Sequence, residues 1–349
     1  MFVYKWSKEM KLILATGISG VGEKQYLKQW EDYCSKRGKK VKIFYVGEMM
    51  IEHARSCGIK LNKDNFLNAD KDLLQMARSA VLTGILSEIA GNLVGYDAVV
   101  MCIHAFMFWK ERFYRTYDRF LKNFSPDMYL TFVDDFRNIS SRLSQRGEWK
   151  GKLTYTKILY WQNVEVEVTM GWADFADKPF FALSTGQPIS TLYKLIFHPE
   201  IETVYVKMPI SHFRELEQRV VIDDFIKALD IPFTVFSPLA IEIVGMIPRE
   251  KFDDSETLTI NNHVVHRDLY WFINQCDIGV TFWPGVVPSP GVNHETHESH
   301  TKTKEEWVIY LGGEASPFIT YFNTKFFSSQ EDFFEFVYSK YPERKGLIW

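Results

Sequence analysis

The chain has 349 residues, enough for two domains, and its 46% hydrophobic and 16% aromatic content excludes a disordered protein. Its formal net charge of −3 argues against a protein that binds a nucleic-acid backbone. The four cysteines lie far apart without a CxxC pair, which indicates a reducing, cytoplasmic setting. We find no signal peptide and no run of about twenty apolar residues, so we expect no membrane partner.

The first half of the chain alternates between apolar strands and longer helical segments. The predicted elements are strand 11–15, helix 24–37, strand 41–46, helix 70–91, strand 98–103 and strand 128–133. Such alternation predicts a parallel sheet in an α/β domain.

A glycine-rich turn, Thr16 to Lys24, joins the first strand to the first helix. This context resembles the P-loop of adenylate-kinase-type nucleotide kinases, and the resemblance implies that Gly17, Gly20, Gly22 and Lys24 bind phosphate. The chain departs from the Walker motif, because Glu23 and Lys24 stand where the motif has Lys and then Ser or Thr. Three interpretations stay open: a weak phosphate-binding loop, a scaffold that has lost nucleotide, and a working kinase that uses ATP and Mg²⁺.

Three arginines follow the fourth strand, at positions where such kinases place lid arginines. They are Arg137, Arg142 and Arg146, and an ordinary solvated helix face explains them equally well. Segments 152–160 and 164–170 alternate like the two strands of a hairpin. The predicted linker at His198-Pro199-Glu200 places the end of the first domain at residue 198.

The second half restarts the alternation of strands and helices. The predicted elements are strand 203–208, helix 215–229, strand 233–236, helix 268–276, strand 278–283, a helix that carries Glu295, strand 307–311 and helix 330–338. In an open α/β sheet the ligand crevice lies at the carboxyl ends of the strands. The loop before Glu295 is therefore a candidate for chemistry.

The strings RDLYW, CDIGV and SPGVNHE resemble the nucleoside 2-deoxyribosyltransferase superfamily, and most of all its 2'-deoxynucleoside 5'-phosphate N-hydrolases. The resemblance implies that Glu295 is the nucleophile at the anomeric carbon and that Asp268 is the acid that serves the leaving base. It also implies that Asp277, Ser289 and Gly291 bind substrate, with Ser289 directed at a 5'-phosphate. Two carboxyl groups suit this chemistry, because one traps the positive charge on the sugar and the other assists departure.

The loop after strand 203–208 corresponds to a phosphate-binding loop in that family. Ser211 and Arg214 are the expected donors there. His294, His297 and His300 stand three residues apart, but they do not form the HExxH pattern, so no metal site is predicted.

We therefore expect two parallel-sheet, three-layer α/β domains, residues 1–198 and 199–349. The expected activity is cleavage of the N-glycosidic bond of a (deoxy)nucleoside 5'-monophosphate, or the related base exchange. A glycosidase of this kind needs no cofactor, whereas ATP and Mg²⁺ belong to the first domain if its loop is active. The alternatives are a nucleotide-sensing regulatory protein and a bifunctional kinase and glycosidase. Homodimerisation is also expected, by analogy with the family.

Overall fold

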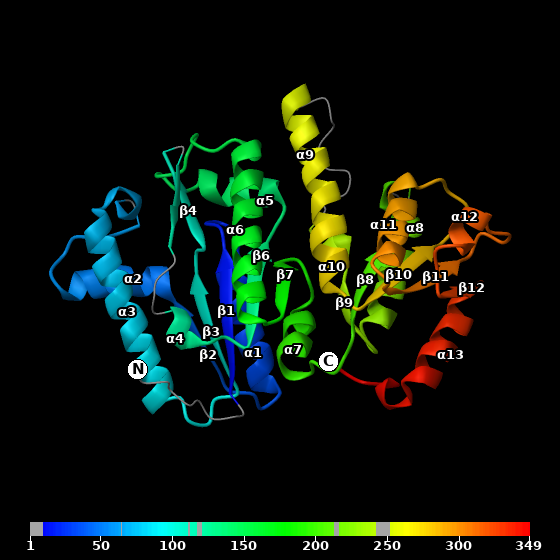
Figure 1. Ribbon diagram of the computed structural model, residues 1–349, viewed down its shortest axis with the longest axis horizontal. Coiled ribbons are helices and arrows are strands. Elements are labelled where there is room, and N and C mark those ends of the chain that lie inside the picture. Colours follow the sequence, from blue (N-terminus) through cyan, green and yellow to red (C-terminus); the bar gives the residue numbers. More distant parts are fainter. Residues whose placement is uncertain (1–9, 64, 111, 117–120, 213–215, 242–251) are drawn as a thin grey trace. The chain divides into compact units, whose positions relative to one another are not determined.

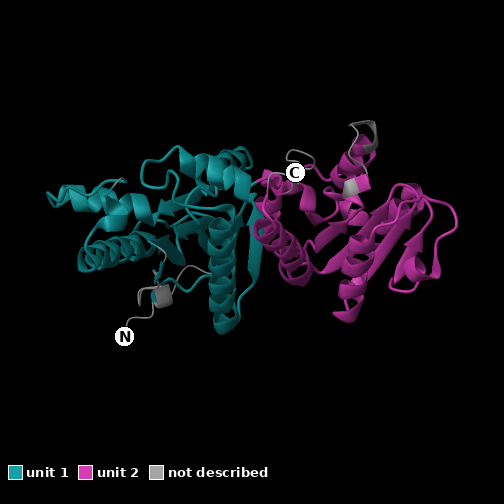
Figure 2. Ribbon diagram, turned by 90° about the horizontal axis from the view of Figure 1, so that it is seen from above, with its two compact units in different colours: residues 1–185 teal, residues 186–349 magenta. Residues whose placement is uncertain are grey.

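The computed structural model describes residues 10–349 except 64, 111, 117–120, 213–215 and 242–251. The chain divides into two compact units, residues 1–185 and 186–349 (Figure 2). Each unit is a three-layer α/β structure built on a five-stranded parallel sheet flanked by helices (Figure 1). The predicted fold class is confirmed.

The sheet of unit 1 has the strand order β2-β3-β1-β6-β7. Its strands are β1 (Lys11–Gly17), β2 (Val41–Tyr45), β3 (Ala98–Ile103), β6 (Met128–Val133) and β7 (Phe180–Ser184). The three inner strands are buried along nearly their whole length. This pattern follows from their continuous apolar sequence, since both faces of a parallel sheet are covered.

In the part of unit 1 that the structure describes, the remaining elements are six α-helices, a 3₁₀ turn and a small antiparallel hairpin of β4 and β5. They are α1 (Glu23–Lys36), α2 (Val46–Ser56), η1 (Phe66–Asn68), α3 (Lys71–Gly91), β4 (Phe106–Trp109), β5 (Arg112–Arg115), α4 (Leu121–Phe124), α5 (Phe136–Ser144) and α6 (Tyr155–Ala176).

The hairpin predicted over 152–170 is wrong, because residues 155–170 belong to the long helix α6. Thr154 caps the helix by accepting a hydrogen bond from the backbone N–H of Lys157 at 3.3 Å. The buried positions Ile158, Glu165 and Thr169 recur at helical spacing along one side. Alternating β-branched residues suggested strands, but packing against the sheet selects the helix.

The sheet of unit 2 has the order β12-β11-β10-β8-β9, and all its neighbouring strands are parallel. Its strands are β8 (Thr203–Lys207), β9 (Thr234–Phe236), β10 (Ile278–Trp283), β11 (Glu305–Tyr310) and β12 (Lys325–Phe327). The core combines aliphatic and aromatic side chains, and the rings of Phe225 and Phe282 stack with centroids 4.1 Å apart.

The helices of unit 2 include one π-helical turn, η5, between two α-helical segments. They are α7 (Ile189–Phe197), η2 (Ile210–His212), α8 (Leu216–Leu229), η3 (Pro238–Ala240), α9 (Asp254–His266), η5 (Arg267–Phe272), α10 (Ile273–Gln275), α11 (Pro290–Thr301), α12 (Pro317–Thr320), α13 (Gln330–Lys340) and η6 (Pro342–Arg344). Among the described residues, no helix is both long and apolar enough to cross a membrane.

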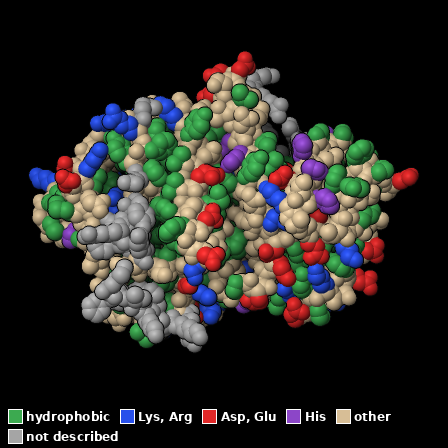
Figure 3. All heavy atoms as spheres, viewed as in Figure 1, with side chains coloured by type: hydrophobic (Ala, Val, Ile, Leu, Met, Phe, Trp, Pro, Cys, Tyr) green, Lys and Arg blue, Asp and Glu red, His purple; other side chains and the backbone are tan. Residues whose placement is uncertain are grey.

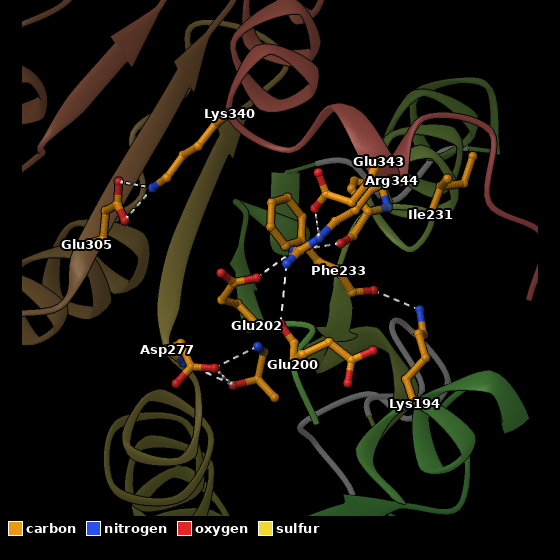
Figure 4. A network of polar contacts seen from close by, with 12 residues as sticks. Lys194, Glu200, Glu202, Ile231, Phe233, Asp277, Glu305, Lys340, Glu343 and Arg344 are labelled. Carbon is orange, nitrogen blue, oxygen red and sulfur yellow. Dashed lines mark hydrogen bonds and ion pairs between the residues drawn. The ribbon is translucent and has the colours of Figure 1, made fainter. Parts of the chain in front are cut away.

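Helix α7 lies in unit 2, although the sequence assigned it to the first domain. The buried Lys194 of α7 donates to the Asp230 carboxylate at 2.7 Å. It also donates to the Phe233 carbonyl at 2.7 Å (Figure 4). A buried charge needs such partners, so α7 is held by the connection between α8 and β9 of unit 2. The division after Thr185 therefore comes earlier than the expected boundary at residue 198.

Candidate active site

The strand order of unit 2 creates a switch point between β8 and β10. From β8 the chain crosses to β9 on one side of the sheet, and from β10 it crosses through α11 to β11 on the other side. The two connections leave neighbouring strands in opposite directions, and in open α/β sheets this is where a ligand crevice forms, at the carboxyl ends of the strands. Lys207 ends β8 and Trp283 ends β10, so the segments after these two residues border the crevice.

Glu295 lies on α11, the helix that follows this edge of β10. Ser289 caps α11 by accepting a hydrogen bond from the N–H of Val292 at 3.5 Å, and Pro290 occupies the first turn, where its missing N–H is harmless. Glu295 is half-buried, and it stands three residues after buried Val292 and next to buried Thr296. The carboxylate is thus at the border between the buried and exposed sides of the helix.

Gly291 lies in the first turn of α11, two residues after the cap. It is exposed, and a Cβ built on it would meet no atom within 4 Å. Packing within the chain therefore does not require glycine at this position.

Asp268 lies in the π-helical turn η5. Both it and the preceding Arg267 are buried, and the Arg267 guanidinium donates to the two carboxylate oxygens at 2.8 and 3.2 Å. A single π-helical turn inside an α-helix is uncommon and is found often at functional sites. The turn places two buried, oppositely charged side chains at adjacent positions.

The segments that carry Asp268 and Glu295 pack against each other. Lys302, at the end of α11, donates to the backbone carbonyl of Leu269 at 2.9 Å and pairs with Glu298 at 2.8 Å. A cation at the carboxyl end of a helix also suits the helix dipole. The structure therefore brings the two candidate catalytic segments together.

Asp277 lies at the other end of β10 from the loop that leads to Glu295. Its carboxylate accepts hydrogen bonds from the backbone N–H and the hydroxyl of Thr203, each at 2.8 Å (Figure 4). These bonds join the starts of β8 and β10. Asp277 is thus engaged in the sheet and is not brought to the crevice edge.

The predicted phosphate donors after β8 are only partly described. Ser211 lies in the short helix η2, close after the carboxyl end of β8. Arg214 lies outside the described residues.

In unit 1, the predicted P-loop connects Gly17, the last residue of β1, to Gly22, the cap of α1. Gly20 and Gly22 have φ of 83° and 97°, a left-handed region that favours glycine. A Cβ at Gly20 would lie 2.9 Å from Leu143, and one at Gly22 would lie 3.1 Å from the Arg142 guanidinium. Side chains of α5 therefore cover this turn closely.

Arg142 binds the carbonyl side of the turn. Its Nη1 donates to the carbonyls of Gly20 and Val21 at 3.0 and 2.8 Å and pairs with the buried Asp134 at 2.6 Å. Lys24 is 59% exposed on its side chain and pairs with Glu48 at 2.6 Å. Burial raises the pKa of Glu23, although backbone N–H groups of the turn lower it. The turn is thus occupied by the chain's own charged groups.

Arg137 also makes an internal pair. Its guanidinium donates to both carboxylate oxygens of Asp135, at 2.7 and 2.6 Å. Arg146 is exposed. The three arginines therefore divide between internal ion pairs and solvent, as far as the described residues show.

A buried carboxylate that the sequence analysis missed lies beside the same turn. Glu165 of α6 accepts hydrogen bonds from the backbone N–H groups of Gly17, Ala105 and Phe106 at 3.2, 2.7 and 2.9 Å. Burial raises its pKa to about 8, although these donors lower it. Sequence reasoning missed this residue because it predicted a hairpin over 152–170. Only a helix assignment would have shown that Glu165 lies on the buried side.

The three histidines of α11 are exposed, and Figure 3 shows histidine side chains gathered at the surface over this helix. The rings of His297 and His300 lie 4.9 and 5.5 Å from the ring of Phe322. Within the described residues, no group of three or more His, Cys, Asp or Glu side chains is arranged to hold a metal ion.

A second missed group is a buried polar cluster beneath α11. Lys207 and Glu306 are fully buried and form an ion pair. Burial raises the pKa of Glu306, while Lys207 and neighbouring hydroxyl groups lower it. The two residues are 99 positions apart, so sequence periodicity carried no signal of their pairing.

No protein-family model and no curated protein matches the chain. Among solved structures, a 2-deoxyribosyltransferase from Bacillus psychrosaccharolyticus is similar at 22% identity over 38% of this chain and 89% of that chain, with a TM-score of 0.29. A conserved protein from Enterococcus faecalis V583 is similar at 14% identity over 40% of this chain and 99% of that chain, with a TM-score of 0.30. At these values the two likenesses carry no argument about activity.

Proposed function

We propose that unit 2 cleaves the N-glycosidic bond of a nucleoside 5'-monophosphate, with Glu295 as the nucleophile. One observation carries this proposal. The half-buried Glu295 and the buried Asp268 lie on two segments that pack together, and α11 starts from the loop that borders the switch point between β8 and β10. Glycoside cleavage uses a pair of carboxyl groups, and open α/β sheets bind ligands at a switch point of this kind.

In the proposed reaction the Glu295 carboxylate attacks the anomeric carbon of the sugar. The bond from this carbon to the base nitrogen breaks, and the base leaves with the electron pair and takes a proton from water. The resulting ester between Glu295 and the sugar is then opened by water in a hydrolase, or by a second base in a transferase.

Asp268 stands beside this site as the second carboxyl group. Its ion pair with Arg267 stabilises the charged carboxylate, because charge-assisted hydrogen bonds of this geometry are strong. We therefore assign Asp268 to orienting the base or the sugar by accepting hydrogen bonds from it. This role differs from the proton donor that the family resemblance implies.

The phosphate of the substrate would lie at the start of α11. Backbone N–H groups at the first turn of a helix attract anions, and Gly291 leaves open space in that turn. The Ser289 hydroxyl adds a donor at this edge of the sheet, where the η2 segment also follows β8.

The experiment is a chromatographic assay of the purified protein with a panel of nucleoside and deoxynucleoside monophosphates and the matching free nucleosides. We expect free base and sugar phosphate from at least one monophosphate, and slower release from its nucleoside. Addition of a second base distinguishes the two chemistries, because only a transferase then forms a new nucleotide. Absence of base release from every compound would contradict the proposal.

A second candidate function concerns unit 1, for which we propose a structural or regulatory role without phosphoryl transfer. The observation that favours it is the pairing of Lys24 with Glu48 and of Arg142 with the turn carbonyls and Asp134. In this arrangement Arg142 already satisfies two carbonyls of the turn, and the lysine nearest the Walker position is engaged elsewhere.

A further inference from the structure

Helix α11 packs on the sheet of unit 2 without an apolar face. Its sequence, PGVNHETHESHT, buries three residues, Val292, Thr296 and Ser299, and only the first is apolar. A helix that covers a sheet ordinarily does so through a stripe of apolar side chains. The hydrophobic effect of a single valine leaves the rotation of α11 weakly defined.

Polar contacts fill this gap. The buried Lys207 of β8 donates to the Ser299 hydroxyl at 2.7 Å and forms an ion pair with Glu306 of β11. Thr281 of β10 donates to Glu306 at 2.7 Å and lies 3.0 Å from the Thr296 hydroxyl. Both buried hydroxyl groups of α11 therefore contact one polar cluster, which is formed by residues of β8, β10 and β11.

Gly279 makes room for this cluster. In the sheet register, Gly279 of β10 lies opposite Glu306 of β11, and Thr281 of β10 lies opposite Lys207 of β8. The side chains of Lys207 and Glu306 therefore meet diagonally across β10, over Gly279. A Cβ at Gly279 would collide with the ends of both charged side chains. The sequence therefore supplies a glycine in a central strand where the pair passes, although glycine weakens a strand.

We infer that the Lys207–Glu306 pair positions Glu295 by fixing the rotation of α11, an inference that rests on the proposed function of Glu295. Glu295 stands one residue before Thr296 and four before Ser299, on the adjoining side of the helix. A rotation of α11 that broke the two hydroxyl contacts would also turn Glu295 from the crevice. Lys207 and Glu306 are thus positioning residues, which act through the helix.

The test compares Ser299→Ala, which removes a hydroxyl from the cluster, with Thr301→Ala. Thr301 is the matched control because its exposed hydroxyl donates to the His297 and Glu298 carbonyls of the same helix. A third variant, Lys207→Met with Glu306→Leu, replaces the charged pair by apolar side chains and avoids an unpaired buried charge. All three are made in the full chain.

The first measurement is amide hydrogen exchange over residues 290–301, which requires no activity. We expect exchange about tenfold faster in Ser299→Ala and in the double variant than in the wild type, and no change in Thr301→Ala. The inference would be overturned if Ser299→Ala and the double variant exchanged no faster than Thr301→Ala.

The second measurement separates kcat from KM for the best monophosphate. Misplacement of a reacting group by about 1 Å costs up to ~100-fold, so we expect kcat to fall by about tenfold to 100-fold at unchanged KM. Faster exchange together with unchanged kcat would overturn the positioning role. A wild-type protein that releases no base would contradict the proposed function instead, and the exchange result would still decide whether the cluster holds α11.

Discussion

Arg267 and Asp268 are neighbours in the chain, and their side chains form an ion pair at 2.8 Å that is almost wholly buried within one π-helical turn. In a regular α-helix, adjacent side chains point about 100° apart and do not face each other. The wider turn thus accompanies a pairing that ordinary helical geometry disfavours. This arrangement lies beside the helix that carries Glu295.

Arg267→Met should destabilise unit 2 by about 3–5 kcal/mol, because it removes the charged partner of a buried carboxylate. The double change Arg267→Met with Asp268→Leu should recover most of this loss, since it removes both charges. Urea denaturation of the variants measures the effect. A single variant as stable as the wild type would show that the pair contributes little.

Gly279→Ala should destabilise unit 2 by at least about 1–3 kcal/mol, because the added methyl group meets the Lys207–Glu306 pair. Gly291→Ala serves as the control, since its surroundings are open and alanine favours helix. Thermal unfolding of both variants gives the comparison. Equal melting temperatures for the two would contradict the packing described for Gly279.

The stability of unit 1 should depend on the protonation of Glu165. Burial raises its pKa from 4.5 to about 8, so the folded protein keeps a proton that the unfolded chain releases. The stabilisation that comes from keeping Glu165 protonated is fully present below about pH 4.5, and it is lost as the pH rises through about 8. Urea denaturation from pH 5 to 9 should show a smaller decline for Glu165→Gln than for the wild type. An identical decline of the unfolding free energy with pH in the two proteins would mean that Glu165 is ionised throughout this range.

Lys24→Ala should leave the affinity for ATP, with or without Mg²⁺, unchanged. The lysine is largely exposed and pairs with Glu48, and such surface pairs contribute roughly 0–1 kcal/mol. Isothermal titration calorimetry measures the affinity. The Arg142→Ala variant, which lacks the hydrogen bonds to the Gly20 and Val21 carbonyls, tests whether these bonds alter ATP affinity. ATP binding that is lost in Lys24→Ala would restore a phosphate-binding role to this residue.

Much of the fold could be predicted from the sequence because strand and helix periodicities are local. The predicted strands 98–103, 128–133 and 278–283 coincide with β3, β6 and β10. The failure over 152–170 has a physical cause. β-Branched residues at alternating positions satisfy a strand pattern, but the same segment also places buried residues at helical spacing, and tertiary packing selected the helix.

The candidate site was only partly accessible to sequence reasoning. Ser289, Gly291 and Glu295 lie in one short segment, so their placement at the start of α11 follows from local signals such as the cap and the proline. The partners of Asp277 and Arg142 depend on how the chain packs. No local pattern shows that Asp277 binds Thr203, 74 positions away, or that Arg142 binds the carbonyls of a turn 122 positions away.

We propose that Glu295 attacks the sugar, and the rate of free-base release by Glu295→Gln tests this role most directly. Glu298→Gln is the matched control, because Glu298 is a half-buried carboxylate of the same helix that pairs with Lys302. We expect Glu295→Gln to lose at least about 100-fold in kcat while Glu298→Gln keeps most of its activity. Base release by Glu295→Gln at the rate of Glu298→Gln would contradict the role of Glu295 as the nucleophile.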